Sequence, residues 1–451
     1  MAPSGNMADL PGDIVRCIAG RVAPECRQRM RAVCSAWSAA VPAEPLPWIL
    51  LQPDDGTAAA DAAERGGFSV LSLPTDSKLP LSITTSAGSG PGPGQRVRCF
   101  GAGHGWLALV GADLSVTLRN PVTGHAISLP PLTRHPMVGA DGLREDGLVL
   151  WRTWLDWWPD SGDLVPAEEF RDTYVRKVVF SARPRQDDYF AVVLGGYHSY
   201  AMYARAGATA WETLRDADGR ALSLVHDVVH VEGGLFLAVT RCHGKVLVLD
   251  LAIHGNAEDD VDDDDGCTAA ATTHHATEDD DDYCYSPSVS TFADPLVMTE
   301  SLDYFVPGAD MHVENHLVLI DGELYQIWAA REAEPLPPEE HNCEKKLNRY
   351  HIADVGVVRY ALTAAGDWEA AAAADLGDWA VLVGRNETVA VCSGDVSGVS
   401  ASCVYFIAGE LEEVVCAFRL RSGRAEPVGG DVLRHACATP LPPVWFLPSL
   451  K

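Results

Sequence analysis

The stretch GWLALVGADLSVTLRNPVTGHAISLPP, residues 105–131, contains the pattern that decides the fold. Two short apolar runs, Gly105–Val110 and Ser115–Arg119, are separated by the turn Gly111–Asp113. A second turn, Asn120–Gly124, follows directly. Short apolar runs between turns rich in Gly, Asn, Asp and Pro are typical of antiparallel strands joined in hairpins.

The same unit recurs along the chain. A strand, a short turn and a second strand, often with a tryptophan before a polar strand end, repeat at intervals of roughly 40 to 60 residues. The other copies are Tyr189–Leu214, Gly234–Leu251, Leu317–Trp328, Val357–Trp368 and Val404–Val428. A β region of roughly 400 residues with about 25 short strands is too large for one sandwich, but suits a propeller of four-stranded blades. We therefore predict an all-β propeller over residues 47–451, with about six blades favoured and seven possible.

The residues before the propeller, 9–46, predict a small all-α motif. Two series of apolar residues recur at the three- and four-residue spacing of a helical face: Ile14, Val15, Ile18 and Val22, then Met30, Val33, Cys34 and Trp37. Pro24 separates the two series, so we predict two helices. Residues 1–8 are predicted to be a disordered tail.

The composition describes a globular protein without a membrane span. The 451 residues are 47% hydrophobic with a mean hydropathy near zero, and no long apolar run occurs. The first residues lack the basic and apolar segments of a secretory signal. The 12 cysteines are scattered without a Cys-x-x-Cys pair, which favours reduced thiols. We therefore expect the protein in the cytoplasm, the nucleus or both.

The net charge of −29 argues against a general affinity for nucleic acid or an anionic membrane. Much of this charge lies in a low-complexity segment, 254–288, which has no lysine or arginine between Glu258 and Asp282. Like charges repel and apolar anchors are few, so we predict a disordered insert between two strands. Such an insert could attract a basic partner, or bind a metal weakly through His274 and His275.

No catalytic, cofactor or metal motif stands out in the sequence. The glycine-rich run Gly101–Gly105 precedes a strand and lacks a following Lys-Ser/Thr, so we interpret it as a turn and not as a phosphate cradle. The candidate metal ligands lack the paired spacing of a structural zinc site and are interpreted as incidental: His312, Glu314, His341, Cys343 and His351. We expect no cofactor, no bound metal and no enzymatic activity.

Four tryptophans cluster in the stretch WRTWLDWWPD, residues 151–160: Trp151, Trp154, Trp157 and Trp158. One interpretation is a strand and a loop that fill the core of a blade. The other is a contact at the rim of the propeller that binds a client protein, because tryptophan is enriched among the residues that contribute most to interface energy.

Several residues of the N-terminal motif resemble the F-box. The match consists of Leu10-Pro11, Asp13–Val15, Ile18, Arg31–Cys34 and Trp37. The resemblance implies that the helices bind a Skp-type adaptor and, through it, a cullin–RING scaffold. It assigns nine residues to contacts with the adaptor or to packing: Leu10, Pro11, Ile14, Val15, Ile18, Val22, Val33, Cys34 and Trp37.

The β region resembles a second known family. One set of matching segments is Pro47–Leu51, His104–Val110, Arg119–Gly124, Leu129–Pro131 and Pro442–Leu450, and another is Leu376–Val391 with Ser400–Ile407. In this order the segments are similar to the plant domain-of-unknown-function family 295, also called the KIB-type β-propeller family. Members of that family often begin with an F-box.

Together the resemblances imply a substrate-recruiting subunit of a Skp–cullin–F-box ubiquitin ligase, whose propeller binds a client protein. Such a subunit does no bond chemistry, but raises the effective concentration of the client near the ubiquitin-charged enzyme. Two alternatives stay open: a ligase-independent interaction propeller on which the helices dock, and a propeller enzyme or sugar-binding module. Buried Ile14 and Ile18 would favour the first, and clustered titratable groups or a metal in the central channel would favour the second.

Overall fold

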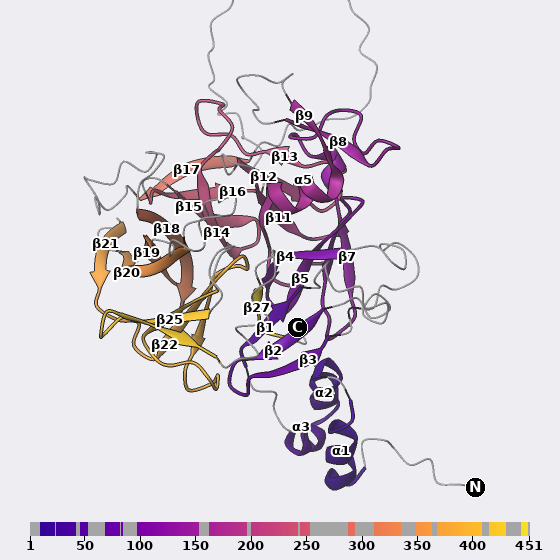
Figure 1. Ribbon diagram of the computed structural model, residues 1–451, viewed down its shortest axis with the longest axis vertical. Coiled ribbons are helices and arrows are strands. Elements are labelled where there is room, and N and C mark those ends of the chain that lie inside the picture. Colours follow the sequence, from indigo (N-terminus) through magenta and orange to yellow (C-terminus); the bar gives the residue numbers. More distant parts are fainter. Residues whose placement is uncertain are drawn as a thin grey trace, which may run out of the picture.

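The computed structural model describes residues 10–22, 24–41, 46–52, 68–81, 83, 97–152, 162–195, 200–241, 244–252, 287–293, 311–334, 349–362, 368–407, 415–429 and 443–449. Six sheets of four or five strands form a ring, and three helices extend from one edge of it (Figure 1). The prediction of a small helical motif followed by a propeller is confirmed, with six blades.

The first three blades come from the two ends and the first half of the chain. Blade 1 contains β1 (Trp48–Leu51), β2 (Ser69–Ser72), β3 (Ser77–Pro80) and β27 (Val444–Phe446). Blade 2 contains β4 (Val97–Gly103), β5 (Trp106–Gly111), β6 (Val116–Arg119) and β7 (Ala126–Leu129). Blade 3 contains β10 (Val175–Phe180), β11 (Phe190–Gly195), β12 (Tyr200–Arg205) and β13 (Glu212–Thr213).

The remaining blades follow in chain order. Blade 4 contains β14 (Val225–Glu232), β15 (Leu235–Thr240), β16 (Val246–Asp250) and β17 (Ser288–Ala293). Blade 5 contains β18 (Met311–Ile320), β19 (Glu323–Glu334), β20 (Arg349–Leu362) and β21 (Trp368–Ala373). Blade 6 contains β22 (Trp379–Val383), β23 (Val389–Cys392), β24 (Cys403–Phe406), β25 (Val415–Arg419) and β26 (Arg424–Val428).

The hairpin units found in the sequence correspond to parts of blades. The opening stretch forms β5, β6 and β7 of one sheet. Two of the predicted units, Leu317–Trp328 and Val357–Trp368, belong to the same blade 5, whose strands are long. This difference explains why the spacing of the units is irregular.

The inner strands of the six blades surround the central axis: β27, β4, β10, β14, β18 and β23. Where β4 meets β10, the two backbones approach closely at Gly101. A Cβ at this position would lie 2.0 Å from the carbonyl oxygen of Val178, so a larger residue would clash with β10. The hydrophobic core lies between neighbouring blades. Trp445 of β27, for example, packs in one cluster with Leu382 and Val391 of blade 6.

The ring is closed by pairing between the two ends of the propeller. β27 supplies the inner strand of blade 1 and pairs antiparallel with β1, Trp48 opposite Phe446 and Leu50 opposite Val444. All four of these side chains are buried. Both segments belong to the stretches that resemble the KIB-type family, but nothing in their sequence predicts that they pair.

The chain departs from an all-β architecture between blades 2 and 3. A 3-10 turn (Leu132–Arg134), the hairpin of β8 (Leu148–Arg152) and β9 (Gly162–Pro166), and helix α5 (Ala167–Tyr174) are inserted there. Helix α5 was not predicted from the sequence. Its apolar pair, Phe170 and Tyr174, is spaced as on a helical face, and the two rings stack with centroids 4.8 Å apart.

The N-terminal motif contains three helices where two were predicted: α1 (Gly12–Ala19), α2 (Pro24–Arg31) and α3 (Ser35–Ala40). The second apolar series is divided because Cys34 is extended, with φ −165° and ψ 169°. None of the helices in the described ranges is long and apolar enough to cross a membrane. The predicted tail 1–8 and all but the last two residues of the predicted insert 254–288 lie outside the described residues.

Candidate functional site

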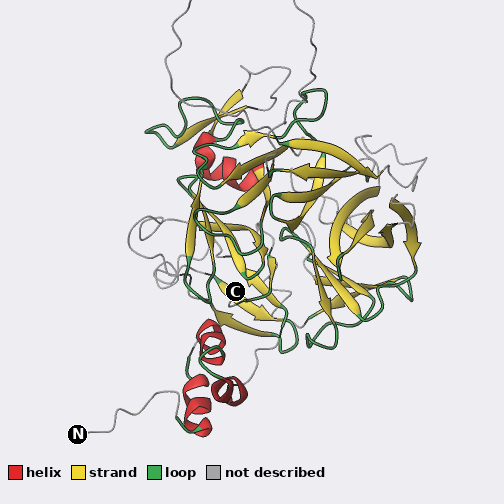
Figure 2. Ribbon diagram, turned by 180° about the vertical axis from the view of Figure 1, so that it is seen from behind, coloured by secondary structure: helices red, strands yellow, loops and turns green. Residues whose placement is uncertain are grey.

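The helical head, defined as residues 10–41, has an apolar core of its own. Val15 and Ala19 of α1, Met30 of α2 and Trp37 of α3 are buried against one another. This core is far smaller than that of the propeller, so the helices need further support to stay folded. Figure 2 shows the helices from behind, extending from the edge of the strands.

Arginine side chains provide part of that support. Arg31 Nη1 donates a hydrogen bond to the backbone oxygen of Val41 over 2.7 Å, which ties α2 to the end of α3. Arg29 donates to the backbone oxygen of Pro121 over 2.9 Å and to that of Val122. The two acceptors lie in the turn after β6, so α2 is a helix that contacts the propeller (Figure 1).

Three large apolar side chains of the head face solvent. Ile14 is 45% exposed, Ile18 39% and Val33 53%. Ile14 and Ile18 lie one helical turn apart and form an apolar strip along α1. In the described part of the chain, the other large apolar side chains with such exposure are Leu143 and Leu164, both in the insertion between blades 2 and 3. Exposed apolar residues that cluster are expected at interaction sites.

The nine residues assigned by the F-box resemblance divide into three groups. Four are exposed: Pro11, Ile14, Ile18 and Val33. Three are half-buried and pack against the core of the head: Leu10, Val22 and Cys34. Two are buried inside that core: Val15 and Trp37. The structure therefore gives Val15 and Trp37 a packing role and leaves the exposed group available to a partner.

The tryptophan-rich stretch is only partly described. The half-buried ring of Trp151, in β8, lies edge-on to Phe170 at 6.0 Å and to Tyr174 at 6.2 Å between centroids. These contacts pack β8 against α5, as the core-filling interpretation expects. Trp154, Trp157 and Trp158 lie outside the described residues, so client binding by this stretch stays a prediction.

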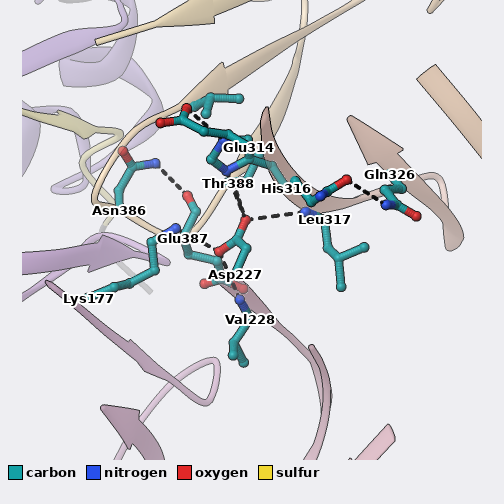
Figure 3. A network of polar contacts seen from close by, with 12 residues as sticks. Lys177, Asp227, Val228, Glu314, His316, Leu317, Gln326, Asn386, Glu387 and Thr388 are labelled. Atoms are coloured by element: carbon teal, nitrogen blue, oxygen red, sulfur yellow. Dashed lines mark hydrogen bonds and ion pairs between the residues drawn. The ribbon is translucent and has the colours of Figure 1, made fainter. Parts of the chain in front are cut away.

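A buried carboxylate, Asp227, joins the inner parts of four blades (Figure 3). It accepts hydrogen bonds from Lys177 Nζ of β10 at 2.7 Å and from the backbone N–H groups of Val228 at 2.8 Å and Leu317 of β18 at 3.2 Å. The hydroxyl of Thr388, directly before β23, donates to it at 2.8 Å. Asp227 is 0% exposed, so this network is closed to solvent and holds the ring together.

His316 lies between two carboxylates. Its Nδ1 is 3.4 Å from Asp227 Oδ2, and its Nε2 is 3.6 Å from Glu314 Oε2, which are ion-pair distances. Arg331 Nη2 lies 3.1 Å from the same Glu314 oxygen. Burial alone would lower the pKa of His316, but the two carboxylates outweigh burial and raise this pKa. Burial alone would raise the pKa of Asp227, but Lys177 and His316 hold it below its usual range.

His226, Glu314 and His316 are the residues of the described part that come nearest to a metal site. One potential ligand atom of each lies within 4.8 Å of the others, and His226 Nδ1 makes no hydrogen bond to any described residue. The surroundings, however, are already positively charged. Arg331 pairs with Glu314, while burial, His316 and Arg176 hold the pKa of His226 well below its usual value. We therefore interpret the cluster as an ion-pair network.

The stability of the propeller should depend on pH through His316. Its folded-state pKa is above the usual 6.5, so its charge contributes stability that is complete below that pH and is lost as the pH rises through the raised pKa. His316→Gln removes this contribution. We expect the difference in unfolding midpoint between wild type and variant to be largest near pH 6 and smaller at pH 9. A difference that stays constant across thermal unfolding curves in this range contradicts the assignment.

A second carboxylate, Glu387, lies at the end of the channel where the inner strands β4 and β14 finish. Its Oε1 accepts a hydrogen bond from the backbone N–H of His230 at 3.0 Å, and its Oε2 lies 3.2 Å from His104 Nε2. His104 and Gly105 have positive φ, 51° and 83°, as the turn between β4 and β5 requires. The turn predicted for Gly101–Gly105 is confined to His104 and Gly105, because Gly101 to Gly103 form the end of β4. The sequence does not reveal that this turn carries a partner of Glu387.

These residues line a cavity of about 270 Å³, which we call the mouth cavity. The side chain of Glu387 is 10% exposed and that of His104 35%, so solvent reaches the carboxylate. Other polar lining residues are His230, Asn386 and Thr388. The rest of the lining is largely apolar and includes Val231, Leu319, Val389, Trp445 and Leu447. This site could not be predicted from the sequence, because its residues are far apart in the chain.

Solved structures with similarity to the chain share little sequence with it. A computationally designed protein, Ika8, is 9% identical, covers 80% of this chain and 90% of its own, and has a TM-score of 0.25. Apo AztD from Citrobacter koseri is 10% identical, with coverages of 88% and 96% and a TM-score of 0.25. The β-propeller domain of Cps50 (Swd1) from Myceliophteria thermophila is 11% identical, with coverages of 73% and 94% and a TM-score of 0.19. Scores this low support no conclusion.

The sequence itself gives the informative match. A search of curated proteins found none that matches. The KIB1-4 beta-propeller family matches residues 70–425, which extend from β2 into β26 and so include strands of all six blades. This match spans most of the described propeller, whose architecture agrees with it. The chain therefore belongs to the KIB1-4 β-propeller family.

Proposed function

We propose that this protein is a substrate-recruiting subunit of a Skp–cullin–F-box ubiquitin ligase. The helical head binds a Skp-type adaptor, and the propeller binds a client protein. The observation that carries the proposal is the exposure of Ile14, Ile18 and Val33 on a head whose own core is already filled by other side chains. Neither part breaks or forms a covalent bond.

The exposed residues define the chemistry of the adaptor surface. A partner that covers Ile14, Ile18 and Val33 gains up to about 1.5–3 kcal/mol from each side chain. That partner needs an apolar groove of matching shape. Exposed Arg16 on α1 and Arg21 just after it favour a groove with acidic residues at its edge.

The alternatives receive less support. If the helices served only to dock on the propeller, Ile14 and Ile18 would be covered, whereas both are exposed and the docking contacts come from Arg29 of α2. Titratable groups do cluster in the channel, as a propeller enzyme would need. Asp227 is fully buried and already paired with Lys177, so a substrate cannot reach it. Glu387 and His104 are the groups of the channel that solvent does reach, and an enzyme would have to use them.

The test is the affinity of the purified chain for a Skp-type adaptor, measured by calorimetry. We expect Ile14→Asp together with Ile18→Asp to weaken binding at least about 100-fold, because two apolar contacts are lost and two carboxylates must be desolvated. Both side chains are exposed, so the thermal midpoint of the chain should stay close to that of wild type.

The matched control is Leu164→Asp, which places the same charge at an apolar side chain of β9 that is 50% exposed. This variant should bind like wild type. Trp37→Ala is unsuitable as a test, because Trp37 belongs to the core of the head and its loss would unfold the helices. A wild-type chain that does not bind the adaptor, or a double variant that binds equally well, overturns the proposal.

A further inference from the structure

We infer that the mouth cavity binds the positively charged side chain of a lysine or arginine that a client protein presents. The inference rests on the proposed function for the role of the client, and it adds the chemistry by which the client is recognised. Four features of the described lining carry it: its charge, its unused acceptors, its apolar walls and its size.

The charge of the cavity selects a cation. Among the described lining residues there is no lysine or arginine, and Glu387 is the one carboxylate. His230 does not offset this charge, since burial lowers its pKa below the usual value. His104, whose pKa Glu387 raises, offsets the charge only while its imidazole is protonated. A carboxylate in a partly enclosed site attracts cations and repels anions more strongly than it would in water. The net charge of −29 favours the approach of basic segments as well.

The cavity also has acceptors left for a donor-rich group. Among the described residues, Glu387 Oε1 accepts a hydrogen bond from the backbone N–H of His230, and Oε2 contacts His104 Nε2. A carboxylate can accept about four hydrogen bonds, so Glu387 has acceptor capacity left for a ligand. Asn386 is 1% exposed and its Oδ1 makes no hydrogen bond within the described residues, although its Nδ2 donates to the backbone oxygen of Glu387 (Figure 3). Ammonium and guanidinium groups supply three to five N–H donors and accept none.

The walls and the size fit one long side chain. Lysine and arginine place their aliphatic stems on apolar surface and their charged ends on polar partners. Val231, Leu319 and Leu447 provide such apolar surface beside Glu387. The volume of about 270 Å³ lies below the roughly 300–1,000 Å³ of typical small-molecule pockets, so a single side chain fills it better than a drug-sized molecule.

The carboxylate is held in place before any ligand arrives. His230 of β14 and the β4–β5 turn at His104 fix Glu387 from two blades. Gly103 allows this approach, because a Cβ there would lie 2.7 Å from Glu387 Oε2. Such a preformed site loses little side-chain freedom on binding.

The experiment uses the full chain and capped pentapeptides, Gly-Gly-Arg-Gly-Gly and its lysine counterpart, with citrulline and norleucine versions as neutral controls. Ligand-observed NMR or calorimetry gives the affinities. We expect the basic peptides to bind at least tenfold more tightly than the neutral ones. Glu387→Gln should remove that difference while keeping an acceptor for His230. Glu232→Gln removes an exposed carboxylate at the end of β14, outside the described lining, and should change affinity less than threefold.

A second variant covers the case in which Glu387→Gln lowers stability. Leu319→Lys places an ammonium group in the mouth while Glu387 stays, and it should also abolish binding of the basic peptides.

Binding of the basic peptides should be stronger at pH 8 than at pH 6, because Glu387 raises the pKa of His104 against the effect of burial, and the His104 proton competes for that carboxylate.

Three results overturn the inference: neutral peptides that bind as well as basic ones, acidic peptides that bind more tightly, or free L-arginine that binds as tightly as the peptide. The last result would indicate a site for a free small molecule and not for a client. No adaptor is present in this experiment. Its failure therefore leaves the adaptor proposal standing, and failure to bind the adaptor leaves this inference standing.

Discussion

Asp227→Ala is expected to lower the unfolding free energy by about 3–5 kcal/mol, the usual cost of removing one partner from a buried ion pair. Lys177 would stay buried without its counter-ion. The N–H of Leu317 and the hydroxyl of Thr388 would lose their acceptor at the same time. Because these partners belong to three other blades, the ring would lose a contact that four of its six blades share.

Urea unfolding followed by circular dichroism measures this loss. Adding Lys177→Met to the Asp227→Ala variant should recover part of it, because the uncompensated charge is then removed as well. Asp218→Ala is the control, since the Asp218 side chain is 72% exposed and its ion pair with Arg220 lies in water, so the midpoint should not change. If Asp227→Ala costs no more than this control, the network contributes little to stability.

Removing Pro443–Lys451 is expected to open the ring and to abolish cooperative unfolding. Trp445 and Phe446 of β27 are each 1% exposed, and Trp445 Nε1 donates a hydrogen bond to the backbone oxygen of Val383 at 3.0 Å. Without β27, β1 becomes an unpaired edge next to an open apolar gap. The shortened chain should be digested rapidly by a protease that leaves the wild-type propeller intact.

Single substitutions at Trp445 provide the graded version of this experiment. Trp445→Ala should cost about 3–5 kcal/mol, as expected for an aromatic side chain removed from a core. Trp445→Phe should cost much less, because it keeps most of the apolar volume and loses the hydrogen bond to Val383. A shortened chain that unfolds at the wild-type midpoint would show that β27 is not needed to close the ring.

The blades could be predicted from sequence because a hairpin is a local feature. The turn Gly111–Asp113 and the apolar runs on either side of it contain all that β5 and β6 need to pair. The pairing of Trp48 with Phe446 could not be predicted in this way, because the apolar pattern of a strand does not show which distant strand it pairs with. Helix α5 was missed because its eight residues bury only a narrow apolar face.

In the candidate sites, too, local features could be predicted from the sequence and contacts between distant segments could not. The spacing of Ile14 and Ile18 predicted their common face, whereas exposure had to come from the structure. Lys177, Asp227 and Thr388 lie in separate blades, so no local pattern connects them. Strand alternation places Glu314 and His316 on the same side of β18, a signal that is present in the sequence but differs from the spacing of a structural zinc site.

The pairing of β1 with β27 also sets an order of events during synthesis. β1 leaves the ribosome roughly 400 residues before β27, which corresponds to about 20–80 s at ordinary elongation rates. Throughout that interval the helical head has already been synthesised, while blade 1 lacks its inner strand. A partner of the head can therefore meet the nascent chain before the propeller is able to close, and a chaperone that shields the waiting edge of β1 would act in the same interval.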